Sequence, residues 1–179
     1  MRETAEELGI LQALLDSSHS QASEHLRGII DEERTLRARE IADLMTGMRV
    51  LSLATVTARG EPRVSGMDGH FLHGRWTMST SRTSPKGRQI LARPAVSAAC
   101  IEGEEVAVFT HGHVELIEAG HEDFAEVHTY WTGFYGSSPL SWGDTVLMRI
   151  IPAWVVGYVS RRDEVLGARG IVPEPRLEK

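Results

Sequence analysis

The feature that most constrains the fold is the alternation of short β-rich runs with turns from Arg49 to Ser160. The runs "VLSLATVT" and "PRVSGMDGHFL" are separated by the turn "ARGE", and "HGR" turns the chain again into "WTMST". "AVSAACIE" and "VAVFTHGHVELIE" flank the turn "GEE", and "DTVLMRIIPAWVVGYVS" supplies the last strands. Short turns join antiparallel neighbours, so the pattern predicts about five to seven such strands in a closed or nearly closed β-barrel.

Helical patterns surround and interrupt these strands, which makes the predicted fold mainly β with flanking helices. Leucines and isoleucines recur at helical spacing over residues 1–46, which we interpret as an N-terminal helical extension of two helices broken at Asp16–Gln21. Residues 47–160 then form the barrel. Residues 161–179 are charged and contain two prolines, so we expect a loosely ordered C-terminal tail.

Charge and cysteine content exclude several classes of protein. A net charge of −6 argues against a broad nucleic-acid-binding surface. No apolar run approaches the ~20 residues of a membrane helix, and the beginning "MRETAEELGI" is acidic, unlike a signal peptide. The single cysteine, Cys100, lies in an apolar run and fits a buried side chain in a reducing compartment. We therefore expect a cytoplasmic protein without nucleic-acid or membrane partners.

Several strands carry apolar residues on both faces, as the run from Val50 to Val56 shows. One face can line the barrel interior, whereas the other needs a helix or a second subunit to cover it. The sequence therefore predicts a homodimer.

The stretch "STSRTSPKGRQI", Ser79 to Ile90, is the best candidate for a binding site because its hydroxyl groups alternate with cations. Ser84 is a plausible N-cap and Pro85 a first helical residue, so a short helix begins here with free backbone N–H groups. Hydroxyls, cations and a helix start together suit a phosphate. From composition alone, a plain solvated loop is an equal alternative, and no P-loop or Rossmann motif is present.

The preceding strand favours the phosphate interpretation. Arg63 and Ser65 alternate with Val64 and therefore share one face of a strand. If this strand pairs with "RWTMSTS", Arg63 and Ser65 could meet Thr80 or Ser81, and Lys86, at one dianion.

The order of these motifs resembles the pyridoxamine 5′-phosphate oxidase-like, FMN-binding split-barrel superfamily. The shared elements are "LATV", "GEPRVS", "TS", a lysine that opens a helix, "RPAVS" and the closing strand "DTVLMRIIPAWVVGY". The resemblance covers roughly residues 47–160. It implies a split-barrel homodimer with a flavin, usually FMN, held between the subunits. Carried over by position, the cofactor-binding residues are Arg63, Val64, Ser65, Gly66, Thr80, Ser81, Lys86 and Arg88.

The resemblance also leaves alternatives open. The basic C-terminal signature of true pyridoxamine phosphate oxidases is missing, so oxidation of vitamin B6 is not expected. A related branch binds the deazaflavin F420, for which Arg82, Arg88 and Arg93 could supply extra cations. We therefore expect an FMN-dependent oxidoreductase acting on a small organic substrate, with an F420-dependent reductase or a non-catalytic flavin-, phospho-ligand- or haem-binding protein as alternatives. No catalytic residue is predicted.

Two further groups of residues have competing interpretations. Pairs of histidines such as His111 and His113 could chelate a metal, but no zinc motif accompanies them, so no metal site is predicted. An aromatic group lies between Tyr130 and Trp142. It can pack the barrel or the dimer, or it can form a wall over the flavin that selects a flat apolar substrate.

Overall fold

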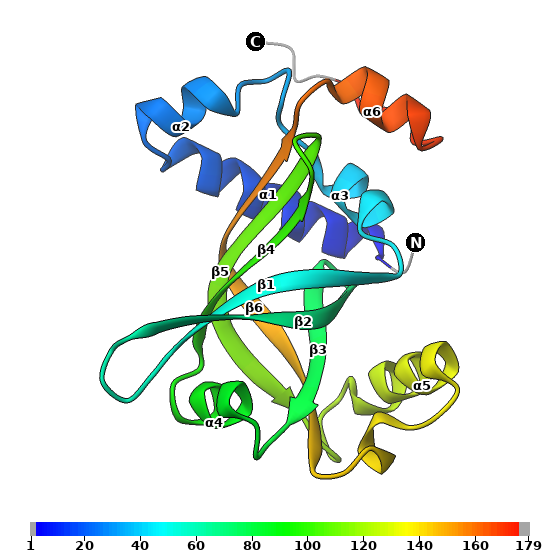
Figure 1. The fold of residues 1–179 in the computed structure, drawn as a ribbon. Helices are drawn as coiled ribbons and strands as arrows, with labels where there is room; N and C mark the ends of the chain where they lie inside the picture. The colour runs from blue at the N-terminus through cyan, green and yellow to red at the C-terminus, as the bar shows by residue number, and fades with distance from the viewer. Residues whose placement is uncertain (1–2, 176–179) are drawn as a thin grey trace.

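The β-rich runs form one closed antiparallel barrel in the computed structural model of the protein, which describes residues 3–175 (Figure 1). The order around the barrel is β1-β2-β3-β6-β5-β4. This architecture confirms the predicted fold class. The strands are β1 Met48–Val56, β2 Pro62–Leu72, β3 Arg75–Ser81, β4 Ala95–Glu102, β5 Val106–Ile117 and β6 Thr145–Val159.

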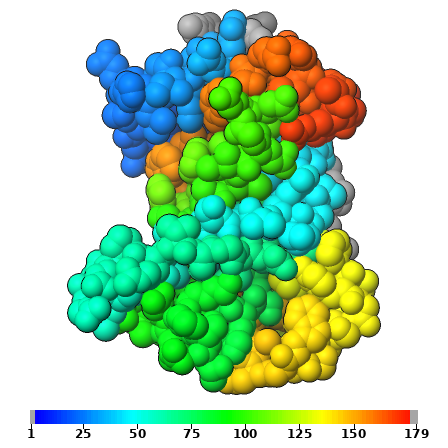
Figure 2. Space-filling view, in the orientation of Figure 1, coloured from blue at the N-terminus to red at the C-terminus, as the bar shows by residue number. Residues whose placement is uncertain are grey.

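The helices gather at the two ends of the barrel. The N-terminal helices and α6 lie at one end, and α4 and α5 lie at the other (Figure 2). None of the helices within residues 3–175 is long and apolar enough to cross a membrane. The helices are α1 Ala5–Ser20, α2 Glu24–Ile29, α3 Ala38–Leu44, α4 Pro85–Ala92, α5 Phe124–Tyr135 and α6 Arg162–Ala168, with a 3-10 turn at Pro139–Ser141.

The N-terminal extension is helical as predicted, but the predicted position of the break between its helices was wrong. Helix α1 continues through the polar stretch to Ser20, and three helices replace the expected two. The serines are accommodated because their hydroxyls find backbone partners. Ser20 Oγ donates to the carbonyl of Ser17, and Ser18 Oγ accepts from the amide of Val155 on β6. A polar stretch that makes such bonds does not have to end a helix.

The prediction of a loosely ordered tail after Arg161 is also wrong for residues 162–168. Residues 162–168 form α6, which buries Val165 and Leu166 in the core. The fully buried Glu40 of α3 accepts two hydrogen bonds from the Arg162 guanidinium and one from the amide of Glu174. These contacts hold the tail against the barrel. Residues 176–179 of the predicted tail lie outside the described residues.

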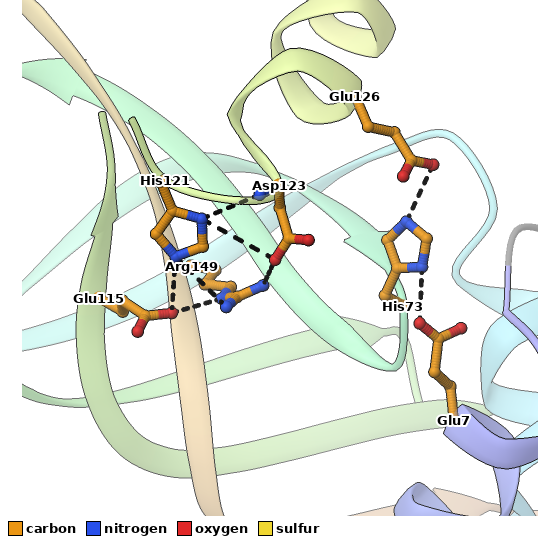
Figure 3. Close-up of polar contacts among 7 residues, drawn as sticks. All are labelled: Glu7, His73, Glu115, His121, Asp123, Glu126 and Arg149. Atoms are coloured by element: carbon orange, nitrogen blue, oxygen red, sulfur yellow. Dashed lines mark hydrogen bonds and ion pairs between the residues drawn. The ribbon is translucent and has the colours of Figure 1, made fainter. Parts of the chain in front are cut away.

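A tight hairpin joins β2 to β3 at His73 and Gly74. Both residues have positive φ angles, 54° and 72°, as a two-residue turn of this kind requires. The His73 ring lies between two helices: Nδ1 is 2.9 Å from Glu7 Oε1 of α1, and Nε2 is 3.1 Å from Glu126 Oε1 of α5 (Figure 3). The hairpin therefore ties both ends of the molecule together.

Candidate functional site

The predicted phosphate loop lies where β3 ends and α4 begins. Ser84 Oγ accepts a hydrogen bond of 3.0 Å from the amide of Gly87, and Pro85 is the first helical residue, as the sequence predicted. The helix start is pressed against the strand. A Cβ atom at Gly87 would lie 2.1 Å from the carbonyl oxygen of Ser81. Only glycine allows this close approach of helix and strand.

We expect Gly87→Ala to destabilise the protein by about 1–3 kcal/mol, because the added methyl group collides with rigid backbone. Chemical denaturation measures the change. Gly133→Ala in α5 is the matched control, since a Cβ atom there would meet nothing within 4 Å. Alanine favours helix, so this control should be neutral or slightly stabilising. Equal effects of the two substitutions would contradict the tight junction.

Lys86 connects this helix start to strand β2. Its Nζ donates a hydrogen bond of 2.6 Å to the carbonyl oxygen of Gly66. An ammonium group carries three donors, so this contact leaves two for another acceptor. Gly66 is exposed, and a Cβ atom at this position would meet nothing within 4 Å. The β2 backbone can therefore be approached closely beside a positive charge.

Strands β2 and β3 pair as predicted, but only near the hairpin. Their ladder runs from Leu72–Arg75 to Gly69–Met78, and residues 62–68 of β2 pair with β1 alone. The two strands thus diverge toward α4. Arg63 Nη2 is 2.9 Å from Glu61 Oε2, in the turn that precedes it.

The remaining predicted residues make mostly local contacts. Ser81 Oγ lies 2.9 Å from Thr83 Oγ1, Thr80 Oγ1 lies 3.3 Å from Ser84 Oγ, and Arg88 donates to the carbonyl of Thr83. Ser65 is half-buried and Val64 exposed on β2. Of the predicted set, the structure joins Lys86 to Gly66 directly, and the convergence of the others on one ligand stays a prediction.

Two features of this region bear on whether a phosphorylated ligand fits it. Ser79 lies two residues before Ser81 on β3, and its Oγ is buried without a hydrogen-bond partner in the described part of the chain. A buried hydroxyl normally has a partner, so an orphan next to the loop is consistent with a missing acceptor or donor. The donors of Lys86 and the hydroxyls of Ser81 and Thr83 are the groups that hold phosphate oxygens.

Arg82 and Arg93, the additional cations suggested for F420, are less available to bind a ligand. Arg82 pairs with Glu118, and its Nε is 3.6 Å from Asp144 Oδ1. Arg93 Nε donates to the carbonyl of Val56 on β1 at 3.1 Å. Both side chains therefore have structural partners, and the carboxylates of Glu118 and Asp144 also offset the positive charge of Arg82.

The aromatic group of α5 encloses His70 on β2, a contact that the sequence did not reveal. His70 is fully buried, with Nδ1 2.9 Å from the Tyr130 hydroxyl and Nε2 3.1 Å from the Tyr135 hydroxyl. Burial lowers its pKa from 6.5 to about 4, although the charge of Asp68 acts in the opposite direction. The ring is therefore neutral at physiological pH and joins α5 to the barrel.

Of the remaining aromatic side chains, some pack in the core and others are exposed to solvent. Trp131 is buried in a cluster with Ile117 and Leu147, which supports the packing interpretation for this residue. Phe134 and Trp142 remain 49% and 44% exposed, and they leave an aromatic edge at this end of the barrel.

The charged residues of a cluster near α5 pair with one another. Arg149 is bonded to Glu115 and Asp123, and His121 Nε2 is 3.5 Å from Glu115 Oε2 (Figure 3). Burial acts to raise the pKa of Glu115, but the hydrogen bond and charge of Arg149 lower it below its usual value. The cluster fastens the loop before α5 to the barrel. No group of three or more potential metal ligands occurs in residues 3–175.

Cys100 is buried, as predicted. Burial, with the nearby charge of Glu102, raises the pKa of its thiol to about 11, so the thiol is unreactive at neutral pH.

Comparisons with known proteins agree with the barrel fold. The family model described as pyridoxamine 5′-phosphate oxidase matches residues 38–156, which is more than half of the chain. Among curated proteins, none matches the sequence.

Three similar solved structures have names that mention different cofactors. A FAD-binding protein from Mesorhizobium loti is 24% identical, with a TM-score of 0.53 over 71% of this chain and 97% of that one. An F420 reductase is 21% identical, with a TM-score of 0.50 over 63% and 92%. The haem storage protein HutZ from Vibrio cholerae is 20% identical, with a TM-score of 0.56 over 67% and 91%. At these identities the likeness establishes the fold alone.

Proposed function

Because the chain belongs to the pyridoxamine 5′-phosphate oxidase family, we propose that it is a flavin-dependent oxidoreductase that binds FMN beside Lys86 and Gly66. The observation that carries this proposal is the contact of Lys86 Nζ with the Gly66 carbonyl, next to the hydroxyl-rich start of α4. This point combines a cation, open backbone and hydroxyl groups. The small organic substrate is reduced or oxidised by the flavin.

The residues of the chain have positioning roles in this proposal. Lys86, Ser81 and Arg88 hold the phosphate, with Thr80 and Arg63 near it. The backbone of Val64 and Gly66 approaches the ring, with Ser65 beside it. The flavin supplies the hydride or electron transfer, so the protein needs to provide orientation and solvent exclusion rather than an acid–base dyad.

Removal of the Lys86 ammonium tests the phosphate placement. We expect Lys86→Ala to weaken FMN binding by about 10- to 100-fold, because a hydrogen bond to a charged group contributes about 1.5–3 kcal/mol. Quenching of FMN fluorescence in a titration measures the affinity. Combination with Arg63→Ala should weaken binding further.

The matched control is Arg59→Ala, which removes an exposed cation from the turn between β1 and β2. Its FMN affinity should equal that of the wild type. If Lys86→Ala binds FMN as tightly as this control while remaining folded, the phosphate does not lie at Lys86.

We also propose that two copies of the chain associate through the outer face of β1, β2 and β4. Val50, Val64 and Ile101 on these adjacent strands are 64%, 71% and 56% exposed. Exposed apolar side chains gathered on one sheet face are typical of a covered interface. Gly66 is two residues from Val64 on the same face of β2, so a partner on this face would also enclose the cofactor.

A charge on this face should prevent association. Val64→Asp would place a carboxylate within the proposed interface, and we expect a monomer where the wild type is a dimer. Sedimentation velocity distinguishes the two. Ala58→Asp in the exposed turn before β2 is the control and should leave the dimer intact. A wild-type protein that is monomeric at high concentration would contradict the proposed interface.

An F420-dependent reductase is the second candidate. The case for F420 is weaker because Arg82 and Arg93, which were expected to bind the acidic tail of that cofactor, already have partners within the protein. Bound FMN and bound F420 have different absorption spectra. A non-catalytic flavin-binding protein would keep its flavin bound but would convert no substrate when a reductant and an acceptor are supplied. A haem-binding protein would show a Soret band in its absorption spectrum instead.

A further inference from the structure

A cavity lies between α1, the β2–β3 hairpin and β6, where the barrel opens on the side away from α4. The β3–β6 ladder ends at Thr77–Arg149, so the hairpin end of β3 and residues 151–152 of β6 do not pair with each other. Residues of α1 close the gap, and the volume left between the three elements is about 210 Å³. Because a liquid water molecule occupies about 30 Å³, the cavity has room for about seven waters or a small organic molecule.

The walls of this cavity are mainly apolar. Leu11 and Leu14 of α1 form one side, and Ile151 and Pro152 of β6 form another. Ile10 of α1 also lines the cavity and is 58% exposed, so the cavity borders on solvent at this residue. The walls therefore suit the hydrocarbon part of a ligand.

Arg75 is the charged lining residue that stands apart, because its guanidinium has no hydrogen bond or ion pair with any residue in the range 3–175. The neighbouring Trp76 is buried in the core, so Arg75 lies on the outer face of β3, where it is half-buried. Charged groups that are withdrawn from water are normally paired. A half-buried guanidinium without a partner therefore favours an anion beside it. The other half-buried arginines all have such partners: Arg37, Arg49, Arg82, Arg93 and Arg149.

The other charged groups of the lining are already engaged. Glu7 Oε2 accepts a hydrogen bond of 2.7 Å from the backbone amide of Thr4, and Glu7 Oε1 lies 2.9 Å from His73 Nδ1 (Figure 3). The second ring nitrogen of His73, Nε2, lies 3.1 Å from Glu126 Oε1. The charge that lacks a partner in this lining is thus the single positive charge of Arg75, which a monoanion balances.

We propose that this cavity binds a small carboxylate with an apolar chain. The carboxylate accepts hydrogen bonds from Arg75, whose planar guanidinium matches a carboxylate in shape and charge. The chain lies against Leu14, Ile151 and Pro152. A phosphate monoester is a poorer match, because its second negative charge would meet the Glu7 carboxylate and no further unpaired cation of the lining. The proposal does not depend on the flavin site, since none of these residues belongs to it.

Three probes with the same hydrocarbon chain and different head groups test the charge preference: hexanoate, 1-hexanol and hexylamine. Titration of the full chain, followed by amide chemical shifts, gives the affinities. Hexanoate should bind about tenfold more tightly than hexanol, because charge-assisted hydrogen bonds are about twice as strong as neutral ones. Hexylammonium should bind most weakly, since its charge would meet a guanidinium of the same sign. Binding of hexanoate no tighter than that of the other two probes, or no binding of hexanoate at millimolar concentration, would overturn the proposal.

Two substitutions locate the site. Arg75→Gln should remove the preference for hexanoate over hexanol. Arg34→Gln is the matched control, because it removes an exposed guanidinium from the segment before α3, and it should preserve the preference. Ile10→Glu adds a carboxylate at an exposed position of the lining and should weaken hexanoate binding about tenfold more than hexanol binding. This variant decides the matter if Arg75→Gln does not fold. An unchanged preference in either Arg75→Gln or Ile10→Glu would show that the carboxylate does not bind beside Arg75.

Discussion

Glu40→Ala should cost about 3–5 kcal/mol of unfolding free energy, because it leaves the Arg162 guanidinium buried without its counter-charge. The Glu40 carboxylate is fully buried and Arg162 is 4% exposed. The Glu40 carboxylate oxygens also accept hydrogen bonds from the backbone amides of Arg37 and Glu174, each at 2.9 Å. The substitution therefore removes partners from α3, α6 and the residues after α6 together. Urea denaturation measures the loss.

Two controls separate burial from charge. Glu164→Ala breaks the exposed pair with Arg161 and should cost at most about 0.5 kcal/mol. The double substitution Glu40→Leu with Arg162→Met replaces both charges by apolar groups and should recover much of the loss. If Glu40→Ala is no more destabilising than Glu164→Ala, the pair does not hold the tail to the barrel.

His70 should make the protein lose stability as the pH falls. Its folded-state pKa of about 4 lies below the value of 6.5 expected for the unfolded chain. Between these pH values the unfolded state binds a proton that the folded state excludes. The stabilisation is therefore complete above pH 6.5 and is lost as the pH falls toward 4. A pKa difference of this size corresponds to about 3 kcal/mol.

The measurement is the unfolding free energy from chemical denaturation at several pH values. His70→Gln cannot titrate, so its curve should fall less steeply than that of the wild type between pH 6.5 and 4. His25→Gln changes an exposed histidine of α2 and should follow the wild type. Parallel curves for His70→Gln and the wild type would contradict the assignment of a buried neutral ring.

The barrel was predictable because its signals are local. Runs of β-branched residues bounded by turns specify strands, and Ser84 with Pro85 specifies the start of α4. The Lys86 region was found in the same way, since cations and hydroxyls stand side by side in the sequence. Such features need no knowledge of distant partners.

The errors concern contacts between residues that are far apart in the chain. Glu40 and Arg162 are separated by 122 positions, and His70 and Tyr135 by 65. No local pattern connects such residues, so the ordered tail and the enclosed histidine could not be predicted. The divergence of β2 from β3 was missed for a related reason. Hydrophobic alternation indicates a strand but does not tell where its pairing ends.

We propose that this chain binds a flavin at Lys86 and Gly66. The most direct test is an absorbance titration of the purified, cofactor-free protein with FMN and, in parallel, with F420. We predict saturable binding of FMN with a shifted flavin spectrum, reversible bleaching by a reductant, and weaker binding of F420. A protein that takes up neither cofactor would contradict the proposed function.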